Sequence, residues 1–434
     1  MEEQSRAPSL IQGNRRLPVL GEVLTGPTYA IWETTLRCNQ ACRFCGTRAG
    51  HARPDELTTE EAINVVEQFA EIGVREVAMH GGEIFLRPDW LEIVAAVAAN
   101  GMQPSIVTGG RGINTALAQQ AKRAGLVAAS VSVDGCEATH DDLRNVRGSH
   151  KSALNAMREL LTAGILVGCN TQINRQNMRE VPALFDELSQ FPLYGWQVQL
   201  MAPMGRAADE PALVLQPYDL LEIIPMLARM RAVTDERGIP MWPGDNVGYF
   251  GPFEHTLRYD RAPGGHSSGC GGGILAIGVE ANGDVKGCSA MSSGGYIAGN
   301  IRKDRLRTLW DESAELKFMR CFDDSKLWGF CASCYYANVC KAGCVWTSST
   351  IFGRHGNCPY CHHRALEFLG KGQRERLNRV MIAPGNIRDR AEFSLEIEAA
   401  PQDWIESMRE LNRPPRDPFE DTLDTTTDEI QRLS

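Results

Sequence analysis

The stretch Thr35-Leu-Arg-Cys-Asn-Gln-Ala-Cys-Arg-Phe-Cys45 places three cysteines within eight residues, with the spacing C-x3-C-x2-C. Thiolates this close together are typical ligands of iron or zinc. A cubane iron-sulfur cluster is usually held by four cysteines, so Cys38, Cys42 and Cys45 would leave one iron without a protein ligand. Structural zinc is the alternative, but it needs a fourth ligand. His51 follows in a loop with glycine and proline, where we expect it to be exposed.

Composition narrows the class of protein. The 434-residue chain has a net charge of -9 and a pI near 5.6, which argues against a general nucleic-acid or anionic-membrane binder, since such contacts need clustered Lys and Arg. The sequence has no run long and apolar enough for a membrane span and no signal peptide. We therefore expect a cytoplasmic protein whose 14 cysteines serve as metal ligands rather than disulfides.

Strand and helix patterns alternate after the first 27 residues. Thr58 and Glu61 form a capping box for a helix that Gly73 ends. The pattern predicts strands at residues 29–34, 74–79, 105–108, 126–133, 165–173 and 196–201, and further helices at 88–100, from Asn114, and at 151–163, 178–190 and 218–237. Such alternation predicts an α/β fold, a partial (β/α)6 TIM-like barrel with its site at the carboxyl ends of the strands.

Four segments follow from these patterns. Residues 1–27 form an N-terminal arm, too short to be an independent peptide-binding domain. Residues 28–240 form the barrel, and residues 241–370 form a Gly-, Pro- and Cys-rich second domain. Residues 371–434 form a C-terminal extension with one helix at about 403–411. Its tail, residues 417–429, carries six acidic and no basic residues and is expected to be solvated.

The cysteine motif after the first strand resembles the signature of the radical S-adenosylmethionine (radical SAM) enzymes. The resemblance implies a 4Fe-4S cluster whose open iron chelates SAM, and cleavage of SAM to methionine and a 5′-deoxyadenosyl radical. His80-Gly81-Gly82-Glu83 is similar to the family's Gly-Gly-Glu motif, which receives the SAM amino group; Ile84 follows where many members have Pro. By the same resemblance, further SAM contacts are Phe44, Arg144, and Ser132 and Asp134 of the segment Ser130-Val-Ser-Val-Asp-Gly135.

The later cysteines resemble the SPASM extension of peptide-modifying radical SAM enzymes, which holds two auxiliary iron-sulfur clusters. The matching pattern is Cys270, Cys288, the run Cys331-x2-Cys334-x5-Cys340-x3-Cys344, and Cys358. The resemblance assigns one cluster to Cys331, Cys334, Cys340 and Cys358, and the other to Cys270, Cys288 and Cys344. Cys361 and Cys321 are candidates for the missing ligand, unless that iron is open.

The later cysteines also allow roles other than cluster binding. Cys331-x2-Cys334 with Cys358-x2-Cys361 could form a zinc ribbon, which would leave Cys340 and Cys344 unexplained. Cys321 or Cys361 could instead donate a hydrogen atom to a substrate radical. Cys136 and Cys169 lie beside or within apolar strands and are expected to be inert.

The resemblance implies a peptide maturase. Its substrate would be a residue of a ribosomally synthesised peptide, and the product a crosslink or other oxidative modification. An electron donor such as flavodoxin or ferredoxin is implied, and a separate leader-binding protein is one route of peptide delivery. Alternatives are a sulfatase-maturating enzyme, a small-molecule radical SAM dehydrogenase, or a noncatalytic zinc or iron-sulfur interaction protein. No general acid or base can be named from the sequence.

Overall fold

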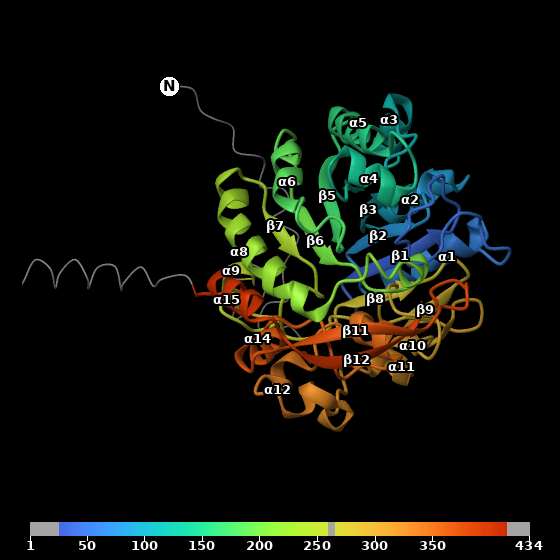
Figure 1. Cartoon of the computed structure of the whole chain (residues 1–434). Helices are drawn as coiled ribbons and strands as arrows, with labels where there is room; N and C mark the ends of the chain where they lie inside the picture. Colours follow the sequence, from blue (N-terminus) through green and yellow to red (C-terminus); the bar gives the residue numbers. More distant parts are fainter. Residues whose placement is uncertain (1–25, 259–264, 415–434) are drawn as a thin grey trace, which may run out of the picture.

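The computed structural model describes residues 26–258 and 265–414, and its main feature is a single mixed sheet (Figure 1). Within these residues the strand order is β10-β9-β8-β1-β2-β3-β4-β5-β6-β7. Neighbours from β8 through β1 to β7 are parallel, whereas β9 and β10 are antiparallel. The strands are β1 (Tyr29–Thr35), β2 (Glu76–Gly81), β3 (Gln103–Thr108), β4 (Ala128–Ser132), β5 (Leu166–Ile173), β6 (Trp196–Leu200), β7 (Met241–Pro243), β8 (Ala276–Val279), β9 (Asp284–Lys286) and β10 (Gly299–Asn300).

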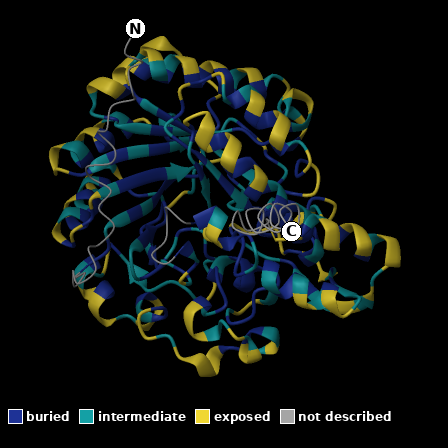
Figure 2. Ribbon diagram, turned by 90° about the vertical axis from the view of Figure 1, so that its left-hand side faces the viewer, coloured by how far each residue is buried: buried dark blue, intermediate teal, exposed yellow. Residues whose placement is uncertain are grey.

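Helices cover the outer face of this sheet (Figures 1 and 2). The barrel helices are α1 (Thr59–Glu71), α2 (Trp90–Ala99), α3 (Thr115–Arg123), α4 (Glu137–Arg144), α5 (Ser149–Thr162), α6 (Val181–Leu188), α7 (Arg206–Asp209), α8 (Leu220–Glu236) and α9 (Glu254–Arg258). The later helices are α10 (Leu306–Glu312), α11 (Ala314–Lys317), α12 (Ala337–Cys340), α13 (Val345–Phe352), α14 (His362–Gly370) and α15 (Gln402–Leu411).

The predicted α/β barrel is confirmed, and its first six strands lie where the sequence placed them to within a few residues. The capping box of Thr58 and Glu61 at the start of α1 is also confirmed. The sheet continues beyond the six strands, because β7 pairs with β6 and β8 pairs with β1. It therefore crosses the boundary predicted at residue 240, which was placed where the helix and strand periodicity stops.

The two faces of the barrel strands differ in chemistry. Outward side chains are apolar and pack on helices: Trp32 meets Phe69 of α1 edge-on at 5.9 Å, and Trp196 stacks on Phe185 of α6 at 5.3 Å. The alternate positions, on the face opposite the helices, are half-buried in β3 to β6. This inner face carries mainly hydroxyl and carboxamide groups, from Ser105, Ser130, Ser132, Asn170, Gln172, Gln197 and Gln199.

The C-terminal extension contains an antiparallel hairpin that the sequence analysis did not predict. It consists of β11 (Gln373–Met381) and β12 (Glu392–Ala399), and it is followed by the predicted helix, α15. The loop between the two strands reaches the barrel: Asp389 accepts a hydrogen bond from Arg48 Nε at 2.8 Å, and its carbonyl accepts one from Gly205 at 2.8 Å. The hairpin loop thus lies against the segment that follows the three clustered cysteines.

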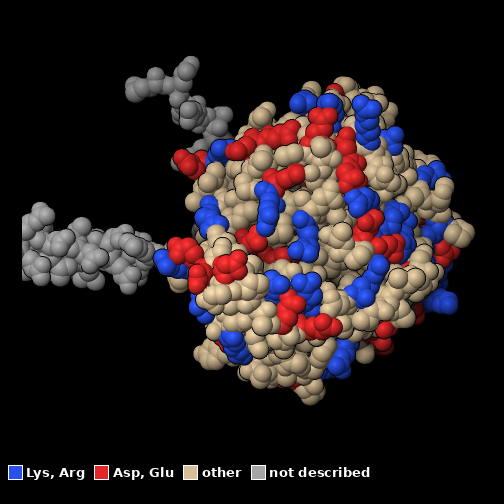
Figure 3. Space-filling view, in the orientation of Figure 1, with Lys and Arg blue, Asp and Glu red and all other residues tan. Residues whose placement is uncertain are grey.

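Two other expectations concern parts of the chain outside the described residues. The acidic tail at residues 417–429 lies there, as does nearly all of the N-terminal arm, residues 1–27. Within the described ranges, none of the helices is long and apolar enough to span a membrane. Basic and acidic side chains are interspersed on the face shown in Figure 3.

Candidate functional site

The SAM cysteine loop, residues 36–50, begins where β1 ends. Its backbone closes on itself, since Cys38 N donates to Gly50 O at 3.0 Å and Gly50 N donates to Leu36 O at 2.9 Å. Arg206 fixes the middle of the loop by donating from Nε to Cys42 O at 2.7 Å. All 14 cysteines are free thiols. Burial, with Glu83 and the neighbouring thiols, raises the pKa of Cys38 to about 12.

The two glycines of the Gly-Gly-Glu motif allow β2 to pack directly on this loop. Gly82 N donates to Thr35 O at 2.7 Å, and Glu83 N donates to Arg37 O at 2.8 Å. A Cβ atom on Gly82 would lie 2.1 Å from Arg37 O, and one on Gly81, whose φ is +133°, would lie 2.2 Å from Thr35 O. Both distances are far inside van der Waals contact, so the motif needs glycine here for backbone packing.

Glu83 is buried at the carboxyl end of β2 and is held by groups from β3 and the residue after it. Thr108 Oγ1 donates to one carboxylate oxygen at 2.5 Å and Gly109 N donates to the other at 2.6 Å. Burial nevertheless raises the pKa of this carboxyl to about 7. Such a group pairs favourably with an added ammonium, which would replace the lost solvation of the carboxylate.

Arg144, Asp134 and Phe44 lie together beside Cys42. Arg144 donates to the Asp134 carboxylate and, at 3.6 Å, to Cys42 Sγ, while its guanidinium lies 5.2 Å from the centre of the Phe44 ring. Asp134 also accepts from Gln172 N at 2.7 Å. The sequence prediction assigned Arg144 and Asp134 separately to SAM; here they contact each other. Arg144 Nε is buried without a hydrogen-bond partner, so this guanidinium keeps one donor for an anion.

Ser132 and His80 face inward from β4 and β2. Ser132 is half-buried on the polar inner face. His80 Nε2 lies 2.9 Å from Ser289 Oγ, and burial, together with Arg388 and Lys286, lowers the pKa of His80 to about 3. The imidazole is therefore neutral at physiological pH. His80, which precedes the Gly-Gly-Glu motif, had no role predicted from the sequence.

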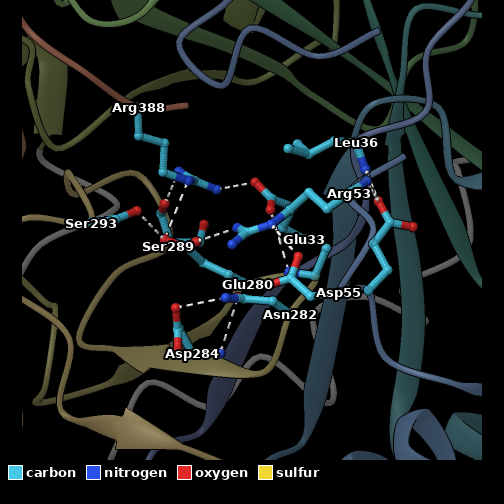
Figure 4. Close-up of polar contacts among 12 residues, drawn as sticks. Glu33, Leu36, Arg53, Asp55, Glu280, Asn282, Asp284, Ser289, Ser293 and Arg388 are labelled. Atoms are coloured by element: carbon cyan, nitrogen blue, oxygen red, sulfur yellow. Dashed lines mark hydrogen bonds and ion pairs between the residues drawn. The ribbon is translucent and has the colours of Figure 1, made fainter. Parts of the chain in front are cut away.

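A buried charge cluster joins this site to the later part of the chain (Figure 4). Arg388 of the hairpin loop donates to Glu33 of β1 and lies 3.4 Å from Glu280, which follows β8. Lys286 of β9 lies 2.5 Å from the same oxygen of Glu280, Oε1, and Arg53 lies 3.0 Å from the other oxygen, Oε2. Against the effect of burial, Arg388 and Lys286 hold the pKa of Glu280 at about 2. The cluster ties the barrel, the second domain and the hairpin together.

The later cysteines form two groups. The first auxiliary group is Cys270, Cys288 and Cys344, whose thiols interact electrostatically in the pairs 270 with 288, 270 with 344, and 288 with 344. The second auxiliary group lines one pocket together with Tyr249, Phe250 and Tyr336, and consists of Cys331, Cys334, Cys340, Cys358 and Cys361. Burial raises the pKa of Cys270, Cys288 and Cys344, so a bound cation would be needed to stabilise their thiolates.

Neither candidate for the missing ligand of the first auxiliary group lies with that group. Cys361, the N-cap residue of α14, lines the pocket of the second group and interacts electrostatically with Cys340 and Cys331. Cys321 is exposed. The spacing Cys358-x2-Cys361 alone could not reveal this, since the partners of a cysteine depend on how distant segments pack.

The donor chemistry of these groups fits iron-sulfur clusters. Among the described residues, no three His, Cys, Asp or Glu side chains lie close enough to bind one metal ion. The cysteines of a cubane each bind a different iron, so their sulfurs stand farther apart than the ligands of a single ion. Free, buried thiols gathered in threes and more fit iron-sulfur clusters by their donor chemistry.

Comparisons with protein families agree with this chemistry. Residues 32–188 match the model of the radical SAM superfamily, and residues 270–335 match SPASM, an iron-sulfur cluster-binding domain. The chain is a radical SAM/SPASM protein. It is therefore an enzyme that uses SAM and iron-sulfur clusters, and the zinc-ribbon and noncatalytic alternatives are set aside.

Curated relatives of this radical SAM/SPASM enzyme carry two kinds of name. An AdoMet-dependent heme synthase of Oleidesulfovibrio alaskensis is 28% identical over 350 residues, which are 75% of this chain and 84% of that protein. The mycofactocin maturase MftC of Mycolicibacterium smegmatis is 28% identical over 335 residues, which are 74% of this chain and 79% of that protein.

Solved structures share the fold at lower identity. The protein anSMEcpe with bound AdoMet is 16% identical, with a TM-score of 0.62 over 79% of this chain and 95% of that chain. SuiB of Streptococcus suis, bound to its precursor peptide SuiA, is 16% identical, with a TM-score of 0.57 over 75% of this chain and 73% of that chain. These likenesses support the barrel with a C-terminal SPASM domain.

Proposed function

We propose that this enzyme uses SAM to abstract a hydrogen atom from a residue of a ribosomally synthesised peptide, leaving an oxidative modification or crosslink. The observation that carries the proposal is the inner face of the barrel. Its hydroxyl and carboxamide groups, on Ser130, Asn170, Gln197 and Gln199, are half-buried and uncharged. Such groups donate and accept hydrogen bonds as peptide backbone does.

The residues around the SAM cysteine loop would prepare the reaction. When bound, the cluster and SAM supply a 5′-deoxyadenosyl radical. Cys38, Cys42 and Cys45 would hold the cluster, and the Glu83 carboxylate would receive the SAM ammonium. Arg144 would offer its free Nε to the SAM carboxylate, and Phe44 would cover the adenine side. The hairpin loop around Asp389 would help to exclude water, since it lies on the segment beyond Cys45.

The SAM cysteine loop lies at the carboxyl end of β1, the end of the strands where barrel enzymes generally have their active sites, and the peptide would lie against the polar inner face. An electron donor such as flavodoxin or ferredoxin would reduce the cluster, and a separate leader-binding protein is a candidate for peptide delivery. We also propose a cytoplasmic location, because reducing conditions keep cluster ligands as thiols.

A heme-type tetrapyrrole is the second candidate substrate. It is favoured by the 28% identity to a protein named AdoMet-dependent heme synthase across 75% of this chain. A tetrapyrrole with charged side chains would be expected to bind cationic side chains. The inner face of β3 to β6 instead offers neutral hydroxyl and carboxamide groups, which fit a peptide better.

The test compares two substrate classes with reconstituted enzyme, SAM and reduced flavodoxin. A pool of synthetic peptides should raise 5′-deoxyadenosine release, and mass spectrometry should show that peptides have lost hydrogen. An iron porphyrin should neither raise the release nor lose hydrogen. Asn170→Ala with Gln199→Ala should reduce the peptide-dependent release and leave the peptide-independent release unchanged. Gln119→Ala, on the exposed face of α3, is the control. Release stimulated only by the porphyrin would replace the proposal with the second candidate.

A further inference from the structure

The first auxiliary group supplies three cysteines to a cluster that usually has four ligands. Both cysteines that might complete it lie elsewhere, Cys361 in the second auxiliary group and Cys321 at the surface. An anionic side chain from another segment, Asp245, interacts electrostatically with all three thiols. This residue belongs to the segment directly after β7 and far precedes the SPASM cysteines in sequence.

The backbone on both sides of Asp245 is firmly held. Gly244 N donates to Val198 O of β6 at 2.7 Å. Asn246 bonds Leu200 twice, donating from Nδ2 to its carbonyl at 2.6 Å and accepting from its amide at 3.1 Å. Asp245 therefore stands at the carboxyl edge of the barrel strands, where their functional residues gather.

Tyr249 connects this segment to the cysteines. Its hydroxyl donates to the Asp245 carbonyl and accepts from Cys344 N at 2.9 Å. Tyr249 has a φ of +92° and Phe250 one of +45°, both in a region that residues with side chains rarely adopt. Strain of this kind persists only where surrounding contacts impose it, and the Tyr249 hydroxyl is one such contact, since it joins the backbone of Asp245 to that of Cys344.

The Asp245 carboxylate has no hydrogen-bond or ion-pair partner among the residues that the structure describes. Its side chain is accessible, yet burial by the surrounding protein raises the pKa of the carboxyl, with Arg258 opposing. The nearby guanidinium of Arg258 is engaged by Glu254 at 3.1 Å and by the carbonyls of Gly244 and Val247. The Asp245 carboxylate is therefore accessible and free to bind a cation.

We infer that Asp245 is the fourth protein ligand of the iron-sulfur cluster held by Cys270, Cys288 and Cys344. A carboxylate oxygen would bind the iron that no cysteine reaches. The first auxiliary cluster would then be closed to substrate, and its role would be electron transfer rather than substrate binding. An oxygen ligand donates less charge than a thiolate, so this cluster would have a higher reduction potential than an all-cysteine cluster.

The experiment uses the full chain with Cys38, Cys42 and Cys45 changed to Ala, so that only the auxiliary clusters remain. In this parent, imidazole should leave the electron paramagnetic resonance (EPR) spectrum of the reduced protein unchanged, because every iron is ligated. Asp245→Ala should respond to imidazole. On mild oxidation it should release one of about eight irons and give a 3Fe-4S signal of about one spin per chain.

Two further variants keep the test decisive. Asp245→Cys should retain about eight irons, ignore imidazole and have a lower reduction potential than the parent. If Asp245→Ala fails to assemble the cluster, Asp245→Cys still tests the assignment. Cys321→Ala should match the parent throughout. An imidazole response in the parent, a spectrum of Asp245→Ala identical to the parent, or an Asp245→Cys protein that still binds imidazole would each overturn the assignment.

Discussion

The SAM cysteine loop and the two auxiliary groups bind the same kind of metal by different structural means. The three proposed ligands of the SAM cysteine loop come from eight consecutive residues at the end of one strand. The proposed ligands of the auxiliary groups come from residues 270–361, across short helices and loops. The first site is formed by local chain geometry, whereas the others exist only when distant segments pack.

The largest expected effect separates the two regions completely. Changing Cys38, Cys42 and Cys45 to Ala should lower the iron content from about twelve to about eight per chain and abolish SAM cleavage. Iron and sulfide analysis with Mössbauer spectra, and assay of 5′-deoxyadenosine, measure this. Because the three changed thiols lie in one short loop, the auxiliary groups should keep their iron. Loss of iron from those groups as well would show that their folding depends on the first cluster.

Arg388 tests whether the hairpin stabilises both regions at once. Arg388→Ala leaves Glu33 buried with its charge uncompensated, which should cost about 3–5 kcal/mol of unfolding free energy. Chemical denaturation followed by circular dichroism measures it. Arg390→Ala is the control, since Arg390 is partly exposed and its pairing with Glu392 is 3.8 Å long, and it should cost under about 1 kcal/mol. Equal losses in the two variants would contradict this role.

Gly82 tests the packing of β2 on the SAM cysteine loop. Gly82→Ala places a methyl group 2.1 Å from Arg37 O and should cost about 1–3 kcal/mol, with weaker cluster retention at Cys38, Cys42 and Cys45. Thermal unfolding and iron content measure both. Gly50→Ala, at the end of the SAM cysteine loop, is the matched control, because its new Cβ would meet nothing within 4 Å. A stable, fully loaded Gly82→Ala protein would show that the loop tolerates displacement.

The smallest expected effect concerns the pH dependence of SAM binding. The pKa of Glu83 is raised to about 7 by burial, so the carboxylate that we propose pairs with the SAM ammonium forms as pH rises through this value. Affinity for SAM should therefore increase about tenfold between about pH 6 and pH 8. Calorimetric titration of the reconstituted protein measures it. Glu83→Gln should bind more weakly and lose the slope; an unchanged slope would assign the titration to another group.

Part of the site could be predicted because its signals are local. The C-x3-C-x2-C spacing, the glycines before Glu83 and the alternation of strands and helices all arise within a few residues of one another, and the family comparison confirms the radical SAM and SPASM assignment. The hairpin β11–β12 was missed although Pro384-Gly385-Asn386 lies between its strands, because β11, QRERLNRVM, is mostly polar and lacks the regular apolar alternation that indicates a strand.

The sequence by itself determined the class of chemistry, since thiol spacing and a parallel strand-helix pattern need no knowledge of distant contacts. Only the tertiary structure decided which cysteines share a site, because Cys361 joins Cys331 and Cys340 through the docking of α14. The pairing of Arg144 with Asp134, the closure of the charge cluster by Arg388, and the position of Asp245 beside Cys344 were likewise decided by packing. Burial in turn raises the pKa of Asp245 and of the Cys344 thiol, and burial is a property of the fold.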